Sequence, residues 1–239
     1  MRLDRFLSNS GVGTRKEVKK LIREGRVTVN GVVVTSPSFK VGELDAVEVE
    51  GRKITKPEKV YILFYKPAGY VTSTEDPHSE TIMKFLPPLK GLFPVGRLDK
   101  DAEGLLLVTT DGEFAHRVIS PKRGVEKEYL VEVEGEITEE KLERLREGVL
   151  LKDGFLAKAK TVSWENKKSL RIVVTEGKYH QVKRMMAAVG LRTIKLKRIR
   201  IGGLVLPQDM SPGEFRFLSE EEVKRVLEGN LEKEDPPRP

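Results

Sequence analysis

Residues 3–24 show two helical patterns, because their apolar positions recur three or four residues apart. These positions are Leu3, Phe6 and Leu7 in the first pattern, and Val18, Leu21 and Ile22 in the second. Glycines at positions 11 and 13 separate the two patterns. Thr14, followed three residues later by Glu17, predicts a capping box at the start of the second helix.

After Gly25 the pattern changes from helical spacing to alternation. The stretch RVTVNGVVV alternates around Asn30-Gly31, a pair that favours the two positive φ angles of a type I′ hairpin turn. A further short strand is expected in AVEVEG, and the charged stretch 51–60, which contains Pro57, is expected to be a linker. Residues 1–54 are therefore predicted to form a small helix-helix-hairpin domain.

From Val60 onward the predicted elements are longer and mixed in type. Strands are expected in 60–66, 104–110, 128–135 and 169–177, and helices in 112–120, 139–148 and 180–190. Because strands and helices do not alternate one for one, the pattern favours an α+β domain with a mixed, mainly antiparallel sheet over residues 59–232. The Pro-rich end, residues 233–239, is expected to be a flexible tail.

Charge and cysteine content narrow the classes of partner and chemistry. The formal net charge is +7 and the sequence pI is about 9.4, which favours a polyanionic partner, nucleic acid before an anionic membrane. The sequence contains no cysteine, which excludes disulfides, thiolate zinc sites and a cysteine nucleophile and favours a cytoplasmic location. The start MRLDRFLSNS lacks the apolar core of a signal peptide, so no membrane association is expected.

Two stretches concentrate the basic residues. The second predicted helix carries the basic residues Arg15, Lys16, Lys19, Lys20 and Arg23, a set that is either a solvated charged face or an RNA-binding surface. The stretch 165–200 holds eleven Lys and Arg against two Glu, a local excess larger than that of the whole chain. Such an excess suits contact with RNA phosphates.

Four acids surround an apolar run in VGRLDKDAEGLLLVTTDG, and three of them have ordinary structural explanations. DKDAEG begins like a calcium loop, but its twelfth position is Thr110 and not the required Glu. Asp101 and Glu103 lie in a turn that enters a strand, with no identifiable partner for a two-carboxylate glycosidase. Asp111 is expected to cap the following helix. Asp99 is left as the candidate for chemistry.

Motifs along nearly the whole chain resemble one enzyme family. Residues 1–50 are similar to the αL RNA-binding module, and GRLDKDAEGLLLVTTDG, KEYLVEV, TEGKYHQVKRMMAAVG and LKRIRIGGL resemble the ribosomal RNA pseudouridine synthases of the RsuA type. The resemblance implies that Asp99 is the catalytic residue and that Arg97 helps hold a flipped-out nucleotide. It further implies that Tyr129 stacks on the target base, Lys183 pairs with the catalytic carboxylate, and Leu196 forms an apolar wall.

The implied reaction isomerises a uridine to pseudouridine. One ionised carboxylate suffices, as a nucleophile at the anomeric carbon or as a base at the neighbouring sugar position, and no metal or organic cofactor is required. The form YHQVKRM is closer to enzymes of the small ribosomal subunit, so the expected partner is 16S rRNA or a small-subunit assembly intermediate, bound by a monomer. The alternatives are the same activity on 23S rRNA, or a non-catalytic RNA-binding or ribosome-assembly protein.

Each candidate residue also has a structural interpretation. Asp99 could be a turn residue paired with Arg97, and Tyr129 could be an ordinary core residue of a strand. His180 is expected to contact phosphate or cap structure, not to act as a general base. His78 and His116 show no spacing that indicates metal binding or catalysis.

Overall fold

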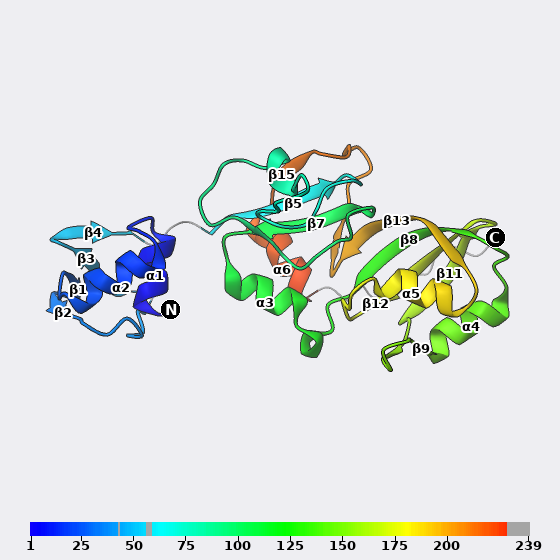
Figure 1. Cartoon of the computed structure of the whole chain (residues 1–239), viewed down its shortest axis with the longest axis horizontal. Helices are drawn as coiled ribbons and strands as arrows, with labels where there is room; N and C mark the ends of the chain where they lie inside the picture. The colour runs from blue at the N-terminus through cyan, green and yellow to red at the C-terminus, as the bar shows by residue number, and fades with distance from the viewer. Residues whose placement is uncertain (43, 56–58, 229–239) are drawn as a thin grey trace. The chain divides into compact units, whose positions relative to one another are not determined.

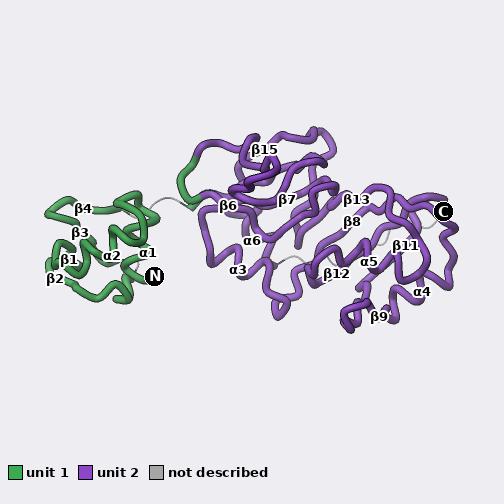
Figure 2. Tube along the Cα trace, viewed as in Figure 1, with its two compact units in different colours: residues 1–59, 89–91 green, residues 60–88, 92–239 purple. Residues whose placement is uncertain are grey.

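The computed structural model describes residues 1–42, 44–55 and 59–228. The chain divides into two compact units, residues 1–59 with 89–91, and residues 60–88 with 92–239 (Figure 2). Pro57 of the expected linker and the predicted tail 233–239 lie outside the described residues.

The first unit contains two helices and a small antiparallel sheet. These are α1 (Leu3–Asn9), α2 (Arg15–Arg23), β1 (Val27–Val29), β2 (Val32–Val33), β3 (Val47–Val49) and β4 (Arg52–Ile54), with strand order β2-β1-β3-β4. The Thr14 side chain accepts from the Glu17 amide and the Glu17 side chain accepts from the Thr14 amide, so the predicted capping box is confirmed. Asn30 and Gly31 have φ angles of 52° and 78°, as the predicted hairpin turn requires.

The linker prediction for residues 51–60 is wrong at its beginning. Residues 52–54 form β4, which pairs antiparallel with β3 and places Ile54 opposite Val47. Ile54 packs against the core of this unit, which explains why a charged segment is held in the sheet. The alternation of apolar and charged residues here is too short to identify a strand from sequence.

The second unit is built on one large sheet (Figure 1). Its main strands are β5 (Tyr61–Lys66), β7 (Glu103–Thr109), β8 (Lys127–Glu134), β11 (Thr161–Asn166), β12 (Ser169–Val174), β13 (Arg192–Ile201) and β15 (Phe215–Phe217), in the order β11-β12-β8-β13-β7-β5-β15. The short strands β6 (Phe93–Pro94) and β14 (Leu204–Val205) pair with β7 and β13. Of these pairings only β13 with β7 is parallel, so the expected mixed, mainly antiparallel sheet is confirmed.

Helices cover different parts of this sheet. The helical segments are α3 (Gly112–Ile119), α4 (Glu139–Glu147), α5 (Gln181–Ala188), α6 (Glu220–Glu228) and the short turns η1 (Ile82–Phe85) and η2 (Pro121–Arg123); a small hairpin pairs β9 (Val149–Leu150) with β10 (Leu156–Ala157). Helices α4 and α5 pack with β8 and β12 in one apolar cluster, and α3 and α6 pack with β5 and β7 in another. A third cluster fills the opposite face of β5 and β7. Strands β5 and β7 are thus buried on both faces, which explains their unbroken apolar runs.

The parallel contact between β7 and β13 joins the two halves of the sheet at its centre. It consists of the pairs Lys197 with Glu103 and Arg198 with Gly104. A Cβ atom on Gly104 would lie 2.2 Å from the backbone oxygen and 2.7 Å from the backbone nitrogen of Arg198, and Gly104 has a φ of +111°. Both the close approach and the backbone angle therefore require glycine.

We predict that Gly104→Ala lowers the free energy of unfolding by more than about 3 kcal/mol, because overpacking and backbone strain add. Gly154→Ala is the matched control, since Gly154 also has positive φ, at +81°, but has open space around it. The control should cost about 1 kcal/mol. Denaturant unfolding of the three proteins measures both, and equal losses in the two variants would contradict the steric argument.

Candidate active site

The loop that precedes β7 is fixed on both sides of Asp99. The buried Thr72 hydroxyl donates to the Leu98 carbonyl at 2.6 Å and accepts from the Leu98 amide at 3.2 Å. On the other side, Lys66 Nζ donates to the carbonyls of Lys100 at 3.2 Å and Ala102 at 2.7 Å. Lys66 is fully buried, and burial lowers its pKa to about 8. The backbone of Asp99 is therefore held between two buried polar anchors.

The carboxylate of Asp99 faces two side chains of the α5 region. Lys183 Nζ lies 3.4 Å from Oδ2, and His180 Nε2 lies 3.5 Å from Oδ1. The same lysine donates to Oδ1 of Asp101 at 2.5 Å. This hydrogen bond lowers the pKa of Asp101 below its usual value. Lys183 thus favours the charged form of Asp101. Asp101, which the sequence predicted only as a turn residue, is also a partner of Lys183.

A cavity of about 480 Å³ opens beside Asp99. Tyr129 of β8 and Leu196 of β13 line it, and both are largely buried. Arg97 lies on its exposed rim, and Phe155 contributes a partly buried ring. The cavity therefore combines apolar and aromatic walls with a few charged groups, the composition typical of a small-ligand site.

Arg198 of β13 is a buried cation in the wall of this cavity that sequence analysis did not single out. It is 4% exposed, and its Nε donates to the Leu105 carbonyl at 2.8 Å. Its Nη1 lies 3.4 Å from the Tyr129 hydroxyl, and its Nη2 has no hydrogen-bond partner in the described part of the chain. The only signal in the sequence was its alternation with Leu196, which places both side chains on the same side of β13.

Lys127 of β8 is a second buried cation that lines the cavity and was not predicted. Its Nζ donates to the Thr175 carbonyl at 3.2 Å. Burial, with a smaller contribution from the nearby charge of Arg198, lowers the pKa of Lys127 from 10.5 to about 8. The interior of the cavity therefore carries positive charge beneath a carboxylate at its edge.

The structure brings together five of the residues predicted from motifs. Asp99, Arg97, Tyr129 and Leu196 line the cavity, and Lys183 pairs with Asp99. The other predicted set lies on α2 in the first unit. Among these, Arg15, Lys16, Lys20 and Arg23 are exposed, and Lys19 is partly buried.

The structure bears on the alternative interpretations of Arg97, His180 and Tyr129. Arg97 is not an ion-pair partner of Asp99 within the described residues, where Lys183 and His180 occupy that position. His180 is the N-cap residue of α5 but its side chain makes no capping hydrogen bond. Tyr129 packs in an apolar cluster, as a core residue does, and it also lines the cavity.

The basic stretch 165–200 is more neutralised than its composition indicates. Arg171, Arg184, Arg192, Lys195 and Arg200 each form an ion pair with an acid of the same unit that lies outside this stretch. These contacts join sequence-distant residues, such as Arg200 with Glu126. A count of charges along the chain therefore overstates the positive charge available to RNA.

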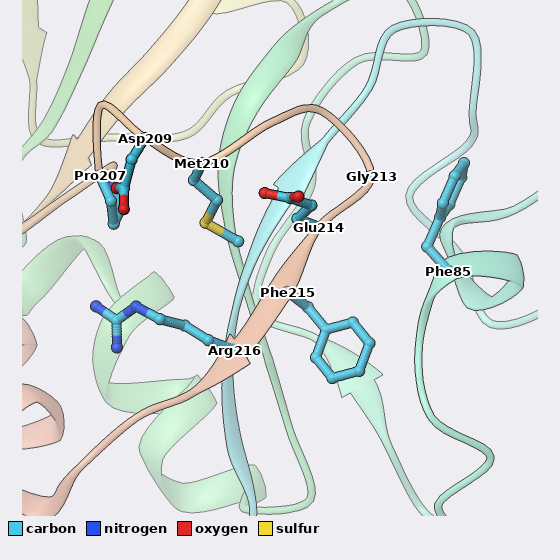
Figure 3. Close-up of a pocket in the computed structure, with 8 residues that line it drawn as sticks. All are labelled: Phe85, Pro207, Asp209, Met210, Gly213, Glu214, Phe215 and Arg216. Carbon is cyan, nitrogen blue, oxygen red and sulfur yellow. The ribbon is translucent and has the colours of Figure 1, made fainter.

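A second cavity, of about 510 Å³, lies beside β15 (Figure 3). Phe85 lies on the side opposite Asp209 and Met210 (Figure 3). Its Arg216 is paired with Glu222 at 2.6 Å, and its Glu214 accepts from the Ser211 amide at 2.7 Å. Because these charges are already paired, this slightly larger cavity is a weaker candidate for chemistry than the one beside Asp99.

Within residues 1–42, 44–55 and 59–228, no group of three or more His, Cys, Asp or Glu residues is arranged to hold a metal ion. No helix within them is both long enough and apolar enough to cross a bilayer.

Comparison with family models matches both units. Residues 60–188 match the model described as RNA pseudouridylate synthase, and residues 1–47 match the S4 domain. The first match contains Asp99, Tyr129 and Lys183, while Leu196 and Arg198 of β13, which also line the cavity, lie beyond its end.

Similar proteins cover nearly the full chain. A protein of Aquifex aeolicus described as an uncharacterized RNA pseudouridine synthase is 47% identical over 95% of this chain and 96% of its own length. The ribosomal small subunit pseudouridine synthase A of Escherichia coli is 39% identical over 95% of this chain and its full length. A crystal structure of a pseudouridylate synthase aligns with a TM-score of 0.70 at 35% identity, covering 95% of this chain and all of that one.

We predict that the stability of the protein depends on the protonation of Lys127. Because its pKa is about 8 in the folded protein and near 10.5 when exposed, the unfolded chain binds more protons between these values. The free energy of unfolding should therefore rise with pH across this window, and the rise should be smaller in Lys127→Met. Lys158→Met, which removes an exposed lysine, is the control. Identical profiles for wild type and Lys127→Met would refute this assignment.

Proposed function

The chain belongs to the pseudouridine synthase family, and from this premise we propose that it isomerises a specific uridine of small-subunit (16S) ribosomal RNA. The full-length similarity to enzymes named ribosomal small subunit pseudouridine synthase A supports this substrate. The structural observation that carries the activity is the Asp99 carboxyl group, 3.4 Å from Lys183 at the edge of a cavity lined by Tyr129 and Leu196. A non-catalytic RNA-binding protein would not need such a site, and this alternative is not favoured.

The reaction requires little beyond one well-placed carboxylate. The bond from the anomeric carbon to the ring nitrogen N1 breaks, the uracil turns over, and a new bond forms from the anomeric carbon to C5. The proton on C5 is then released, and N1 ends with a proton. Asp99 acts as nucleophile at the anomeric carbon or as base at the neighbouring sugar position. Both routes need an ionised carboxylate, and Lys183 places an ammonium group 3.4 Å from it.

The remaining residues of the cavity hold the base while it is detached. Tyr129 offers a ring for stacking, and Leu196 an apolar wall that limits escape of the free uracil. Arg97, at the exposed rim, is placed to contact the backbone of the flipped nucleotide. Arg198, with an unpartnered Nη2, is placed near Tyr129 to support negative charge on the detached ring.

The S4 domain supplies a second RNA-binding surface. The capped helix α2 presents Arg15, Lys16, Lys20 and Arg23 to solvent, with Lys19 partly buried beside them. Linking this surface to the catalytic domain raises the effective concentration of one binding site relative to the other. We propose that the enzyme works in the cytoplasm as a monomer, on 16S rRNA or on an assembly intermediate, because residues of one unit of one chain line the cavity.

We predict that Asp99→Asn lowers turnover at least about a thousandfold while leaving fold and RNA affinity nearly unchanged, because only the negative charge is lost. Release of tritium from uridine labelled at C5 measures the isomerisation, and filter binding measures affinity. Asp101→Asn is the matched control on the same loop and should stay within about tenfold of wild type, since Asp99 keeps its own contact with Lys183. Substantial turnover by Asp99→Asn, or an equally complete loss in Asp101→Asn, would reject the assignment.

Mapping of pseudouridine in rRNA tests which ribosomal RNA is the substrate. Chemical mapping of both large rRNAs from a strain lacking the gene should show one missing pseudouridine in 16S rRNA, restored by the wild-type gene and not by Asp99→Asn. A missing modification in 23S rRNA would instead support the large-subunit alternative. Unchanged maps in both rRNAs would contradict the proposed function.

We predict that replacing Arg15, Lys16, Lys19, Lys20 and Arg23 together with Gln weakens rRNA binding and flattens its dependence on salt. Each lost phosphate contact should reduce the slope of log K against log salt by about 0.7–0.9. The buried Val18 and Ile22 of α2 remain, so the domain should keep its core. Affinities measured over a salt series would oppose a role for this face if the lines of variant and wild type coincide.

A further inference from the structure

Tyr179 exposes an aromatic ring beside the catalytic carboxylate. The residue is 71% exposed and lies between β12 and α5. Its ring stacks on His180 with centroids 3.8 Å apart and an angle of 16° between the planes. His180 Nε2 in turn lies 3.5 Å from Asp99. A large exposed ring therefore lies one side chain away from the reacting group.

The backbone that carries this ring is held by several hydrogen bonds. The buried Gln181 accepts from the Lys178 amide through its side-chain oxygen and donates to the Lys178 carbonyl through its backbone, each at 3.1 Å. Its side-chain nitrogen donates to Glu176 at 3.1 Å, and Arg184 Nη1 donates to the Tyr179 carbonyl at 3.3 Å. The ring is thus presented from an ordered loop, which reduces the entropy lost when a ligand binds it.

Packing and helix capping do not explain this arrangement. His180 has φ 48° and ψ 32°, a left-handed conformation that is unfavourable for a residue other than glycine. Its side chain makes no capping hydrogen bond, and Tyr179 belongs to none of the apolar clusters found among the described residues. Strained residues of this kind concentrate at functional sites.

The surroundings favour a nucleobase as the ligand. Gly177 and Lys178, which precede Tyr179, line the rim of the cavity that would take the target nucleotide. When that nucleotide turns into the cavity, the adjacent nucleotide of the strand stays outside, near this rim. The exposed Lys178 supplies positive charge for its phosphate, and single-stranded bases stack readily on exposed aromatic rings.

We propose that the stacked Tyr179–His180 pair is a binding platform for the nucleobase next to the target uridine. The proposal rests on the proposed function, since it assigns the target nucleotide to the cavity beside Asp99. The Tyr179 ring stacks on the neighbouring base, and His180 fixes the position of this stack relative to Asp99. The platform thereby sets where the strand enters the site.

The test uses the full-length Asp99→Asn protein, in which chemistry is blocked, and a single-stranded uridine heptamer with 2-aminopurine next to the central uridine. Fluorescence titration measures both affinity and stacking of the reporter base. Adding Tyr179→Ala should weaken binding roughly tenfold to hundredfold and restore the emission that stacking quenches. Tyr179→Phe, which keeps the ring, should bind like its parent. Trp164→Ala, which removes an exposed ring on β11, is the control and should also leave binding unchanged.

Three outcomes overturn the platform. Unchanged binding by Tyr179→Ala shows that the ring does not contact the strand. An equal loss in Tyr179→Phe assigns the effect to the hydroxyl, and an equal loss in Trp164→Ala assigns it to general exposure of aromatic surface. Tritium release by the wild-type enzyme tests the proposed function independently of the platform. If the wild-type enzyme releases tritium and Tyr179→Ala does not change binding, only the platform is refuted. If binding depends on Tyr179 but no pseudouridine forms in either rRNA, the proposed function is refuted, while the Tyr179 ring still binds a nucleobase.

Discussion

The close parallel contact between β7 and β13 organises the catalytic domain. It is only two residue pairs long, and it exists because Gly104 lets the backbone of β7 approach that of Arg198. The loop with Asp99 enters β7 immediately before this contact, while β13 carries Leu196 and Arg198 past the same point. The site therefore forms where two otherwise antiparallel halves of the sheet meet, and α5, which leads into β13, brings Lys183 to the same place.

Charge is distributed in the site by depth. Lys66, Lys127 and Arg198 are buried, and each donates at least one hydrogen bond to a backbone carbonyl, which holds its charged group in place. Asp99 and Lys183 are partly exposed, where substrate can reach them. Burial of cations costs free energy, and backbone carbonyls offset that cost without neutralising the charge. Lys66 thus holds the loop in place, while Lys127 and Arg198 make the wall of the cavity favourable for the anionic character of RNA and of a detached uracil.

Local sequence patterns predicted most of the elements, because caps, turns and periodicity act over a few residues. The Thr14 capping box, the Asn30-Gly31 turn and the Asp111 cap are of this kind. Strand β13 was not predicted, because Arg198 and Arg200 follow Leu196 on its buried face. A hydrophobicity pattern counts these arginines as polar and therefore shows no apolar alternation. Arg200 is buried where it pairs with Glu128 of the adjacent strand β8 and with Glu126, which directly precedes that strand. That pairing is a property of the sheet and not of the segment.

In the candidate site, too, some residues can be identified from a local motif and others depend on the tertiary fold. The motif singled out Asp99 and, through resemblance, Lys183, Tyr129, Arg97 and Leu196, whose positions the structure brings together. Neither the strained His180 nor the second contact of Lys183 could be inferred, because both depend on how α5 docks against the loop.

The shared lysine has a consequence for the charge balance of the reaction cycle. In the proposed reaction, Asp99 loses its negative charge once it forms a covalent bond or accepts a proton, which would leave the ammonium group of Lys183 without this counter-ion at the midpoint of the reaction. Asp101, at 2.5 Å and largely exposed, retains its charge throughout. Lys183 therefore keeps a counter-ion while its other partner reacts, and the electrostatic penalty of forming the intermediate is smaller than a single isolated ion pair would impose.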